Sequence, residues 1–118
     1  MKQFVSVFVL ALCVLPNGAY AETCKDNPKL IGACYVAHGR LRFYNGAPSA
    51  RIWVWSEKRM LGVHDDKLPE NLVPYADMNT EVTGDYLVCP LTPQQPHVMQ
   101  MVCVQDVAHK DIHHRDRE

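Results

Sequence analysis

A histidine and two methionines at alternate positions are the first side chains in this sequence with the chemistry to bind a ligand. His97, Met99 and Met101 would share one face of a β-strand with Cys103, because side chains alternate along a strand. Thioether sulfurs are soft ligands that select Cu(I), so the set indicates a copper site. The competing interpretation places this face in the core beside a buried disulfide, where methionine fills irregular gaps.

Three histidines near the C-terminus form a second candidate metal site. His109, His113 and His114 lie beside carboxylates, and two histidines four residues apart can share a metal ion on a helix. We expect residues 109–118 to form a flexible polar tail. Because such a tail does not fix its ligands, we expect no more than an adventitious metal site there.

Two tryptophans and an arginine form the candidate partner-binding surface. Arg51, Trp53 and Trp55 would lie on one face of a strand, with Ile52 and Val54 on the other. Tryptophan and arginine often anchor partners, and this surface would suit an envelope protein or a glycan. The competing interpretation packs both tryptophans against the second sheet of a sandwich.

The sequence holds no recognisable catalytic set. It lacks Gly-x-Ser-x-Gly, His-Glu-x-x-His and a phosphate-binding glycine loop. Ser49 and Ser56 fall in turn-like stretches, and the sequence places no base beside either. We therefore predict no catalytic residue and no cofactor. A hydrolase remains only an outside alternative to a non-enzymatic protein.

Four cysteines beyond the N-terminal segment, Cys24, Cys34, Cys89 and Cys103, predict two disulfides. They allow three pairings. We favour Cys24–Cys34 across a turn, and Cys89–Cys103, because folding the two apolar runs around residue 96 places these cysteines opposite each other. Since no Cys-x-x-Cys spacing occurs, a redox or metal-binding thiol pair is disfavoured.

Residues 1–21 have the pattern of a cleavable signal peptide. A positive start precedes an apolar run over residues 4–15, and the segment ends in Ala19-Tyr20-Ala21. The apolar run is shorter than the roughly 20 residues that a spanning helix needs, so we predict no transmembrane anchor. The alternative interpretation is a lipoprotein signal with Cys13 as the lipidated residue. Such a signal needs a small residue before the cysteine, and Leu12 is not small. We expect a periplasmic or secreted protein.

The charge balance bears on the kind of partner. Twelve basic and 13 acidic residues give a formal net charge of −1. No basic field exists to hold nucleic acid, so we predict no nucleic-acid partner.

The length beyond the signal fits a single domain, which we place at residues 22–108. The oligomeric state is left open.

Alternating apolar and polar residues predict an all-β fold. Asn45-Gly46 is a strong turn signal between the first two strands, and Gly84-Asp85 indicates a bulge or bend. The irregular stretch 64–81 is interrupted by prolines, and it predicts no more than one helical turn, at residues 68–72. We predict a small β-sandwich, transthyretin-like or immunoglobulin-like, with five to seven strands in residues 33–107. The candidate strands are 35–43, 51–55, 60–63, 82–91 and 98–104.

Six short motifs occur in order along the chain. They are His38-Gly-Arg-Leu, Tyr44-Asn-Gly-Ala-Pro, Arg51-Ile-Trp, Arg59-Met-Leu-Gly-Val, Gly84-Asp-Tyr-Leu-Val-Cys-Pro and Met99-Gln-Met-Val-Cys-Val. Together they resemble a family of small secreted proteobacterial proteins of unknown function, which implies secretion but no activity. The first strand–turn–strand unit is similar to transthyretin-like and carboxypeptidase-regulatory-like sandwiches. The chain lacks the terminal Tyr-Arg-Gly-Ser motif of the transthyretin-related hydrolases, so that activity is not expected.

These observations predict a non-enzymatic binding or accessory module of the cell envelope. The alternative is an extracytoplasmic copper-binding protein. The two differ in whether the tryptophan surface or the methionine set faces the solvent.

Overall fold

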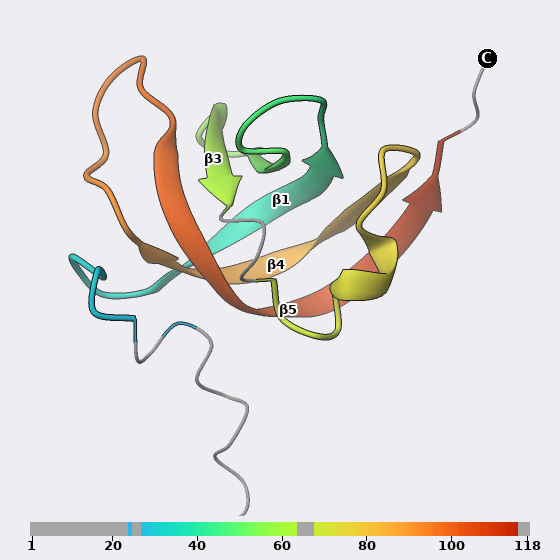
Figure 1. Cartoon of the computed structure of the whole chain (residues 1–118), viewed down its shortest axis with the longest axis horizontal. Helices are drawn as coiled ribbons and strands as arrows, with labels where there is room; N and C mark the ends of the chain where they lie inside the picture. Colours follow the sequence, from blue (N-terminus) through green and yellow to red (C-terminus); the bar gives the residue numbers. More distant parts are fainter. Residues whose placement is uncertain (1–23, 25–26, 64–67, 116–118) are drawn as a thin grey trace, which may run out of the picture.

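A computed structural model describes Cys24 and residues 27–63 and 68–115 of the chain (Figure 1). Its five strands form one mixed sheet that closes into a barrel in the order β1-β2-β3-β5-β4. Neighbouring strands are antiparallel except for β3 and β5, which are parallel. The elements are β1 (Tyr35–Phe43), β2 (Ala50–Val54), β3 (Arg59–Val63), the 3-10 helix η3 (Val73–Tyr75), β4 (Thr80–Pro90) and β5 (Gln100–His114).

Apolar and polar residues alternate along the strands because successive side chains point into and out of the barrel. Leu41, Ile52, Val82 and Tyr86 are buried, and their neighbours along each strand are more exposed. Burial raises the pKa of the Tyr86 hydroxyl, which donates a hydrogen bond to the Val82 carbonyl. The prediction of a small all-β domain is therefore confirmed.

The two-sheet sandwich expected from the sequence is not what these strands form. β3 pairs with β5 in parallel, from Leu61 opposite Gln100 to Val63 opposite Val102. This pairing joins the β1–β2–β3 meander to the β4–β5 hairpin, so a single sheet surrounds the core. The transthyretin-like and immunoglobulin-like arrangements depended on the pairing of distant strands, which alternation along each strand does not specify.

The hairpin of β4 and β5 is longer than predicted and is bent at two places. The register shifts between Thr83 and Asp85, confirming the bulge expected at Gly84, and again between Leu87 and Val88. Residues 109–114, expected to be part of a flexible tail, instead belong to β5 and pair with the start of β4. The prediction failed because residues 109–114 have no alternating apolar pattern. Backbone hydrogen bonds to a neighbouring strand can nevertheless hold such a polar stretch in a sheet.

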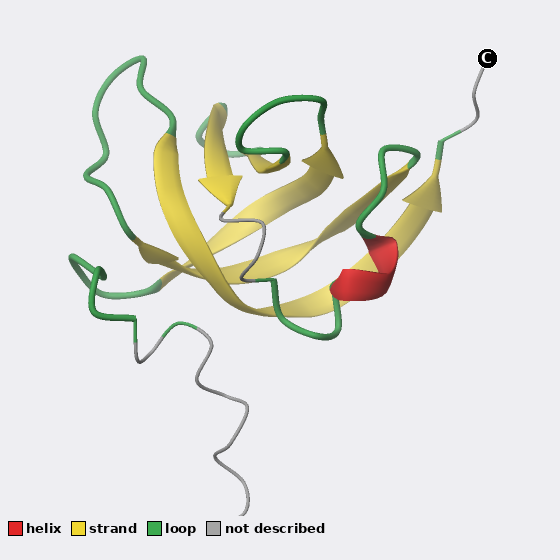
Figure 2. Cartoon of the chain, in the orientation of Figure 1, coloured by secondary structure: helices red, strands yellow, loops and turns green. Residues whose placement is uncertain are grey.

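The connection from β3 to β4 contains the helix η3 (Figure 2). Leu72, just before this helix, is completely buried in the core cluster, and Tyr75 packs against that cluster. The helix is one turn long, as expected, but it lies at Val73–Tyr75 and not at residues 68–72, where the sequence suggested it. No helix in the described ranges is long and apolar enough to cross a membrane.

Both disulfides are present, but the predicted pairing is wrong. The bonds join Cys24 to Cys103 and Cys34 to Cys89. Cys89 and Cys103 do lie opposite each other on β4 and β5, as the sequence suggested. Each bonds instead to a cysteine from the segment before β1, because that segment runs beside the same end of the hairpin. The Ile31 N–H, for example, donates to the Pro90 carbonyl at 3.1 Å.

The predicted signal peptide, residues 1–21, and the alternative lipidation site Cys13 lie outside the described residues. The expectation that the chain is exported thus rests on the sequence pattern and on the two disulfides, which are typical of oxidising compartments.

Candidate functional site

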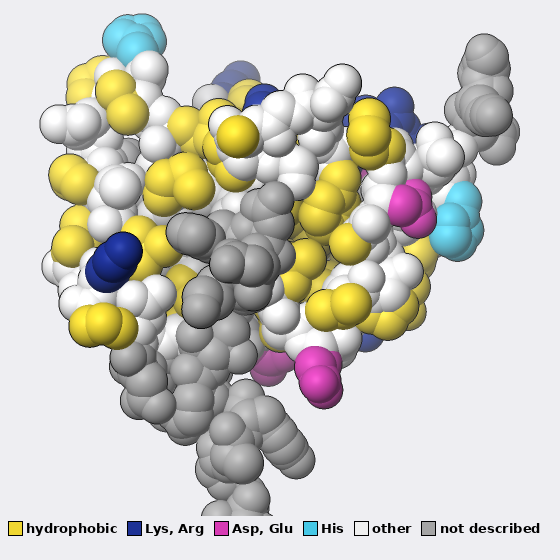
Figure 3. Space-filling view, in the orientation of Figure 1, with side chains coloured by type: hydrophobic (Ala, Val, Ile, Leu, Met, Phe, Trp, Pro, Cys, Tyr) yellow, Lys and Arg dark blue, Asp and Glu magenta, His cyan; other side chains and the backbone are white. Residues whose placement is uncertain are grey.

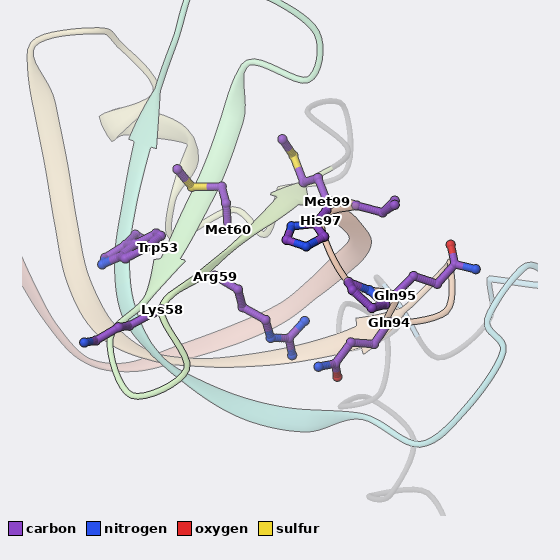
Figure 4. A pocket seen from close by; sticks show the side chains of 10 residues that line it. Trp53, Lys58, Arg59, Met60, Gln94, Gln95, His97 and Met99 are labelled. Atoms are coloured by element: carbon purple, nitrogen blue, oxygen red, sulfur yellow. The ribbon is translucent and has the colours of Figure 1, made fainter.

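A groove of about 670 Å³ lies where β2 and β3 meet the loop between β4 and β5. In Figure 4, Trp53 and Lys58 lie on one side, Gln94 and Gln95 on the other, and Arg59 between them. The remaining lining residues are Met60, Pro96, His97, Val98 and Met99. A concave surface lined by both apolar and polar side chains is typical of a ligand site.

Trp53 lines the groove because of its place in β2. Ile52 and Val54 are buried in the barrel, so the alternation turns Trp53 to the outside, where it is half-buried. Gly39 of β1 allows a close approach of the two strands, since a Cβ at this position would lie 1.9 Å from the Trp53 carbonyl oxygen. The predicted packing of the tryptophans against a second sheet is therefore wrong.

Arg59 lies between the two sides of the groove and is held by a network of hydrogen bonds. Its Nε donates to Glu57 Oε1 at 2.6 Å, its Nη1 to Gln100 Oε1 at 2.9 Å and its Nη2 to the Tyr35 hydroxyl at 3.3 Å. Gln100 Nε2 in turn donates to the Thr92 carbonyl at 2.8 Å. Burial opposes the charge, but the hydrogen bonds outweigh it and raise the pKa of Arg59. The guanidinium is thus a fixed, permanently charged element of the site.

The loop between β4 and β5 forms the opposite wall. It is tied to the barrel where the Met101 N–H donates to Thr92 Oγ1 at 2.9 Å. At its tip the Val98 N–H donates to the Gln95 carbonyl at 3.3 Å, closing a turn in which His97 has a φ of 63°. Apolar side chains reach the surface in this part of the molecule (Figure 3), and Val98 is 54% exposed. The loop therefore offers both apolar and polar groups to the groove.

Met99 and Met101 lie on the outside of the barrel, so the interpretation that placed them in the core is wrong. Val102 and Val104 of β5 face the interior, and the alternation turns Met101 outward. Both methionines are half-buried. Their sulfurs lie over Gly62 of β3, where a Cβ would be 2.6 Å from Met101 Sδ and 2.9 Å from Met99 Sδ.

The three residues of the predicted partner surface are not brought into one site. Only Trp53 lines the groove. Arg51 is directed to the other end of β2, where its guanidinium lies 4.8 Å from the centroid of the Tyr44 ring and Nε donates to the Pro48 carbonyl. Trp55 follows β2 and is 47% exposed.

Two histidines and one aspartate form a cluster that the sequence did not reveal. Asp85 Oδ1 lies 2.7 Å from His38 Nδ1, and Asp85 Oδ2 lies 2.8 Å from His109 Nδ1. The hydrogen bond from His38, followed by that from His109, lowers the pKa of Asp85. His38 and Asp85 are direct partners across β1 and β4. The cluster could therefore have been predicted only by knowing which strands pair and in which register.

The structure does not bring the tail histidines together into one cluster. They lie on β5 rather than on a helix, and His109 is bound to Asp85 while His113 Nε2 lies 3.5 Å from Asp111. His114 pairs through its backbone with Thr80. No group of three or more His, Cys, Asp or Glu side chains in the described part of the chain could hold a metal ion.

Comparisons of the chain with family models, with curated proteins and with solved structures find no match in any of the three. The resemblance to a family of small secreted proteins stays a prediction. The function must therefore be argued from the groove itself.

Proposed function

We propose that the protein is a non-enzymatic binding module whose groove holds a short, negatively charged oligosaccharide of the cell envelope. The observation that carries this proposal is the position of Trp53. A half-buried tryptophan on the outer face of β2 forms one wall of a groove, opposite two glutamine amides and next to two cations.

Each wall of the groove has a role in sugar binding. The ring of Trp53 offers a flat apolar surface on which the C–H face of a pyranose can stack. Gln94 and Gln95 each bring a side-chain amide with both donors and an acceptor, which suits the hydroxyl groups of a saccharide. The groove also has the size of a typical small-ligand site.

The charge of the groove favours an acidic sugar. Lys58 and Arg59 line it, and none of the described lining residues is acidic. Glu57 partly offsets Arg59, to which it is bound. A carboxylate or phosphate on the saccharide would therefore find Lys58 at the rim. Since the net charge of the whole chain is −1, an extended nucleic acid is a poorer fit.

The topology of the barrel supports the same location. We propose that the barrel is of the OB type, a five-stranded barrel that binds oligosaccharides or oligonucleotides through strands 2 and 3 and through the loops between strands 1 and 2 and strands 4 and 5. The groove is built from β2, β3 and the β4–β5 loop. This is an analogy between folds, so the side chains of the groove carry the argument for the ligand.

The compartment is part of the proposal. Two disulfides in a small domain are typical of the periplasm or the exterior of the cell, where envelope glycans are found. An exported chain with this groove could act as an accessory module that recognises a glycan for a partner protein.

Calorimetric titration of the disulfide-bonded protein with matched neutral and acidic tetrasaccharides tests the proposal. We expect binding of an acidic oligosaccharide that Trp53→Ala reduces by roughly tenfold or more, as removal of a central aromatic anchor commonly does. Trp55→Ala is the matched control and should bind normally. Failure of every acidic and neutral saccharide to bind, or an equal loss in both variants, would reject the groove as a glycan site.

A further inference from the structure

We infer that the outer face of β3 and β5 holds a site for a soft monovalent metal ion, Cu(I) or Ag(I), with the sulfurs of Met99 and Met101 and the imidazole of His97 as ligands. This inference does not depend on the proposed glycan site. It uses Met101, which does not line the groove, and it uses none of Trp53, Lys58 or the glutamine amides.

The geometry of the two sulfurs is the main observation. Met101 Sδ and Met99 Sδ lie 2.6 Å and 2.9 Å from the position that a Cβ of Gly62 would occupy. Both sulfurs, together with Pro48 Cγ, therefore fill the space that any other residue at position 62 would need, and the two sulfurs lie close to each other on the outer face. The absent side chain of Gly62 is what allows the two thioethers to converge.

His97 could supply a nitrogen ligand beside Met99. His97 is exposed, lies two residues before Met99 and lines the same groove as Met99 (Figure 4). Its φ of 63° is in the left-handed region, which few non-glycine residues adopt. The turn closed by the Val98 N–H and the Gln95 carbonyl holds the backbone in this shape.

The donor types select the ion. Thioethers favour Cu(I), whereas hard ions such as Mg²⁺ and Ca²⁺ need oxygen ligands, which the proposed set lacks. All four cysteines in the described residues are bound in disulfides, so no thiolate among them competes for a soft ion. Thioethers also remain available in an oxidising compartment, where thiols are consumed in disulfides.

Titration of the disulfide-bonded protein with Ag(I), a redox-inert probe for Cu(I), tests the inference. The readout is the 13C-methyl NMR signal of each methionine, which reports contact of its own sulfur with the metal. We expect one Ag(I) per chain, with shifts of the Met99 and Met101 methyl groups. Met78 is 54% exposed and is not one of the proposed ligands, so it provides the internal control.

Substitutions separate this site from non-specific thioether binding. Met99→Leu and Met101→Leu should each weaken Ag(I) binding by about tenfold or more, and Met78→Leu should not. Gly62→Ala removes no ligand, but its methyl group would meet both methionine sulfurs and, at 2.9 Å, Pro48 Cγ, so it should displace the two flexible thioethers and also weaken binding. His97→Ala should lower the affinity while leaving the methionine shifts in place.

Three outcomes would overturn the inference. They are equal shifts of Met78 and Met99, unchanged affinity in both Met99→Leu and Met101→Leu, and equally tight binding of Zn(II) by the wild-type protein. Thermal unfolding of each variant without metal verifies that the barrel is retained. Glycan binding by the Met101→Leu variant should be normal, so failure of the metal site and failure of the glycan site are distinguishable.

Discussion

Two glycines determine where the side chains of the two candidate sites can lie. Gly39 lets the backbone of β2 approach β1 so closely that a Cβ would lie 1.9 Å from the Trp53 carbonyl oxygen. Gly62 leaves the space that the sulfurs of Met99 and Met101 occupy. At both positions glycine is needed because a side chain would clash with its neighbours, and not because the backbone has a conformation that favours glycine.

Replacing Gly39 by alanine should destabilise the barrel. The added methyl group meets backbone atoms of β2, which cannot move away as a flexible side chain would, so we expect a loss of about 1–3 kcal/mol in the free energy of unfolding. Gly32→Ala is the matched control, because its Cβ would meet only Pro90 Cγ at 3.7 Å, an ordinary contact. Urea unfolding compares the two. Equal stability of both variants would show that β1 and β2 are not packed as described.

The His38–Asp85–His109 cluster should make stability depend on pH in the acid range. The pKa of Asp85 in the folded protein lies below its ordinary value of 3.8. A carboxyl lowered in this way adds stability above pH 3.8, and that stability is lost as the pH falls through the folded pKa. Asp85→Asn should therefore lower the thermal midpoint at about pH 6, and the difference from the wild type should vanish in strong acid.

A control identifies the source of this effect. Asp111, on β5, also lies near a histidine, but its Oδ2 is 3.5 Å from His113 Nε2 and its side chain is 73% exposed, against 34% for Asp85. Asp111→Asn should change the pH profile less than Asp85→Asn. A constant difference between Asp85→Asn and wild type at every pH would contradict the role of the charged carboxylate.

At the scale of elements, the disulfides attach the segment before β1 to one end of the β4–β5 hairpin. Cys34 precedes β1 and bonds to Cys89, 55 residues away, while Cys24 bonds to Cys103, 79 residues away. Links between such distant positions restrict the unfolded chain more than the short loops that the sequence suggested. Each bond should therefore contribute a large share of the stability of so small a domain.

Peptide mapping without reduction should recover Cys24 linked to Cys103 and Cys34 linked to Cys89. Removing the second bond by the double substitution Cys34→Ala and Cys89→Ala should cost about 2–5 kcal/mol in the free energy of unfolding. Chemical unfolding of the oxidised proteins measures this loss. Recovery of a Cys89–Cys103 peptide would contradict the described arrangement of the N-terminal segment.

Individual strands could be predicted from the sequence, but the way they pair could not. Alternation located β1 exactly over residues 35–43 and placed the others within a few residues, except for the C-terminal half of β5. It also marked the bulge at Gly84. The sequence did not predict the closure of the barrel through β3 and β5, and it did not predict the disulfide partners. Both depend on which distant segments become neighbours in the fold.

The candidate site was predictable to a similar extent. Trp53 was chosen for its residue type, and the structure places it in the groove. Lys58, Gln94 and Gln95 were missed, since polar residues in turns give no local sign of a shared site. The His38–Asp85–His109 cluster was missed because it needs both the β1–β4 register and the bend of β5.

For the whole molecule, the groove is a product of barrel closure. Its walls come from β2 and β3 on one side and from the β4–β5 loop on the other, and the parallel pairing of β3 with β5 brings them together. The larger cluster of buried apolar side chains fills the barrel, the smaller one is formed by Cys24, Cys89 and Cys103, and neither includes a residue that lines the groove. This separation is why substitutions in the groove should alter binding with little effect on folding.

The indole N–H signals of the two tryptophans offer the most direct test of the central claim, that a glycan binds in the groove through Trp53. The chain contains two tryptophans, so a 15N–1H spectrum shows one indole signal for each, assigned with the Trp53→Phe variant. On titration with an acidic oligosaccharide, we predict that the Trp53 signal shifts in a saturable manner while that of Trp55 stays in place. A shift of Trp55 alone, equal shifts of both signals, or no shift with any acidic saccharide would contradict the account.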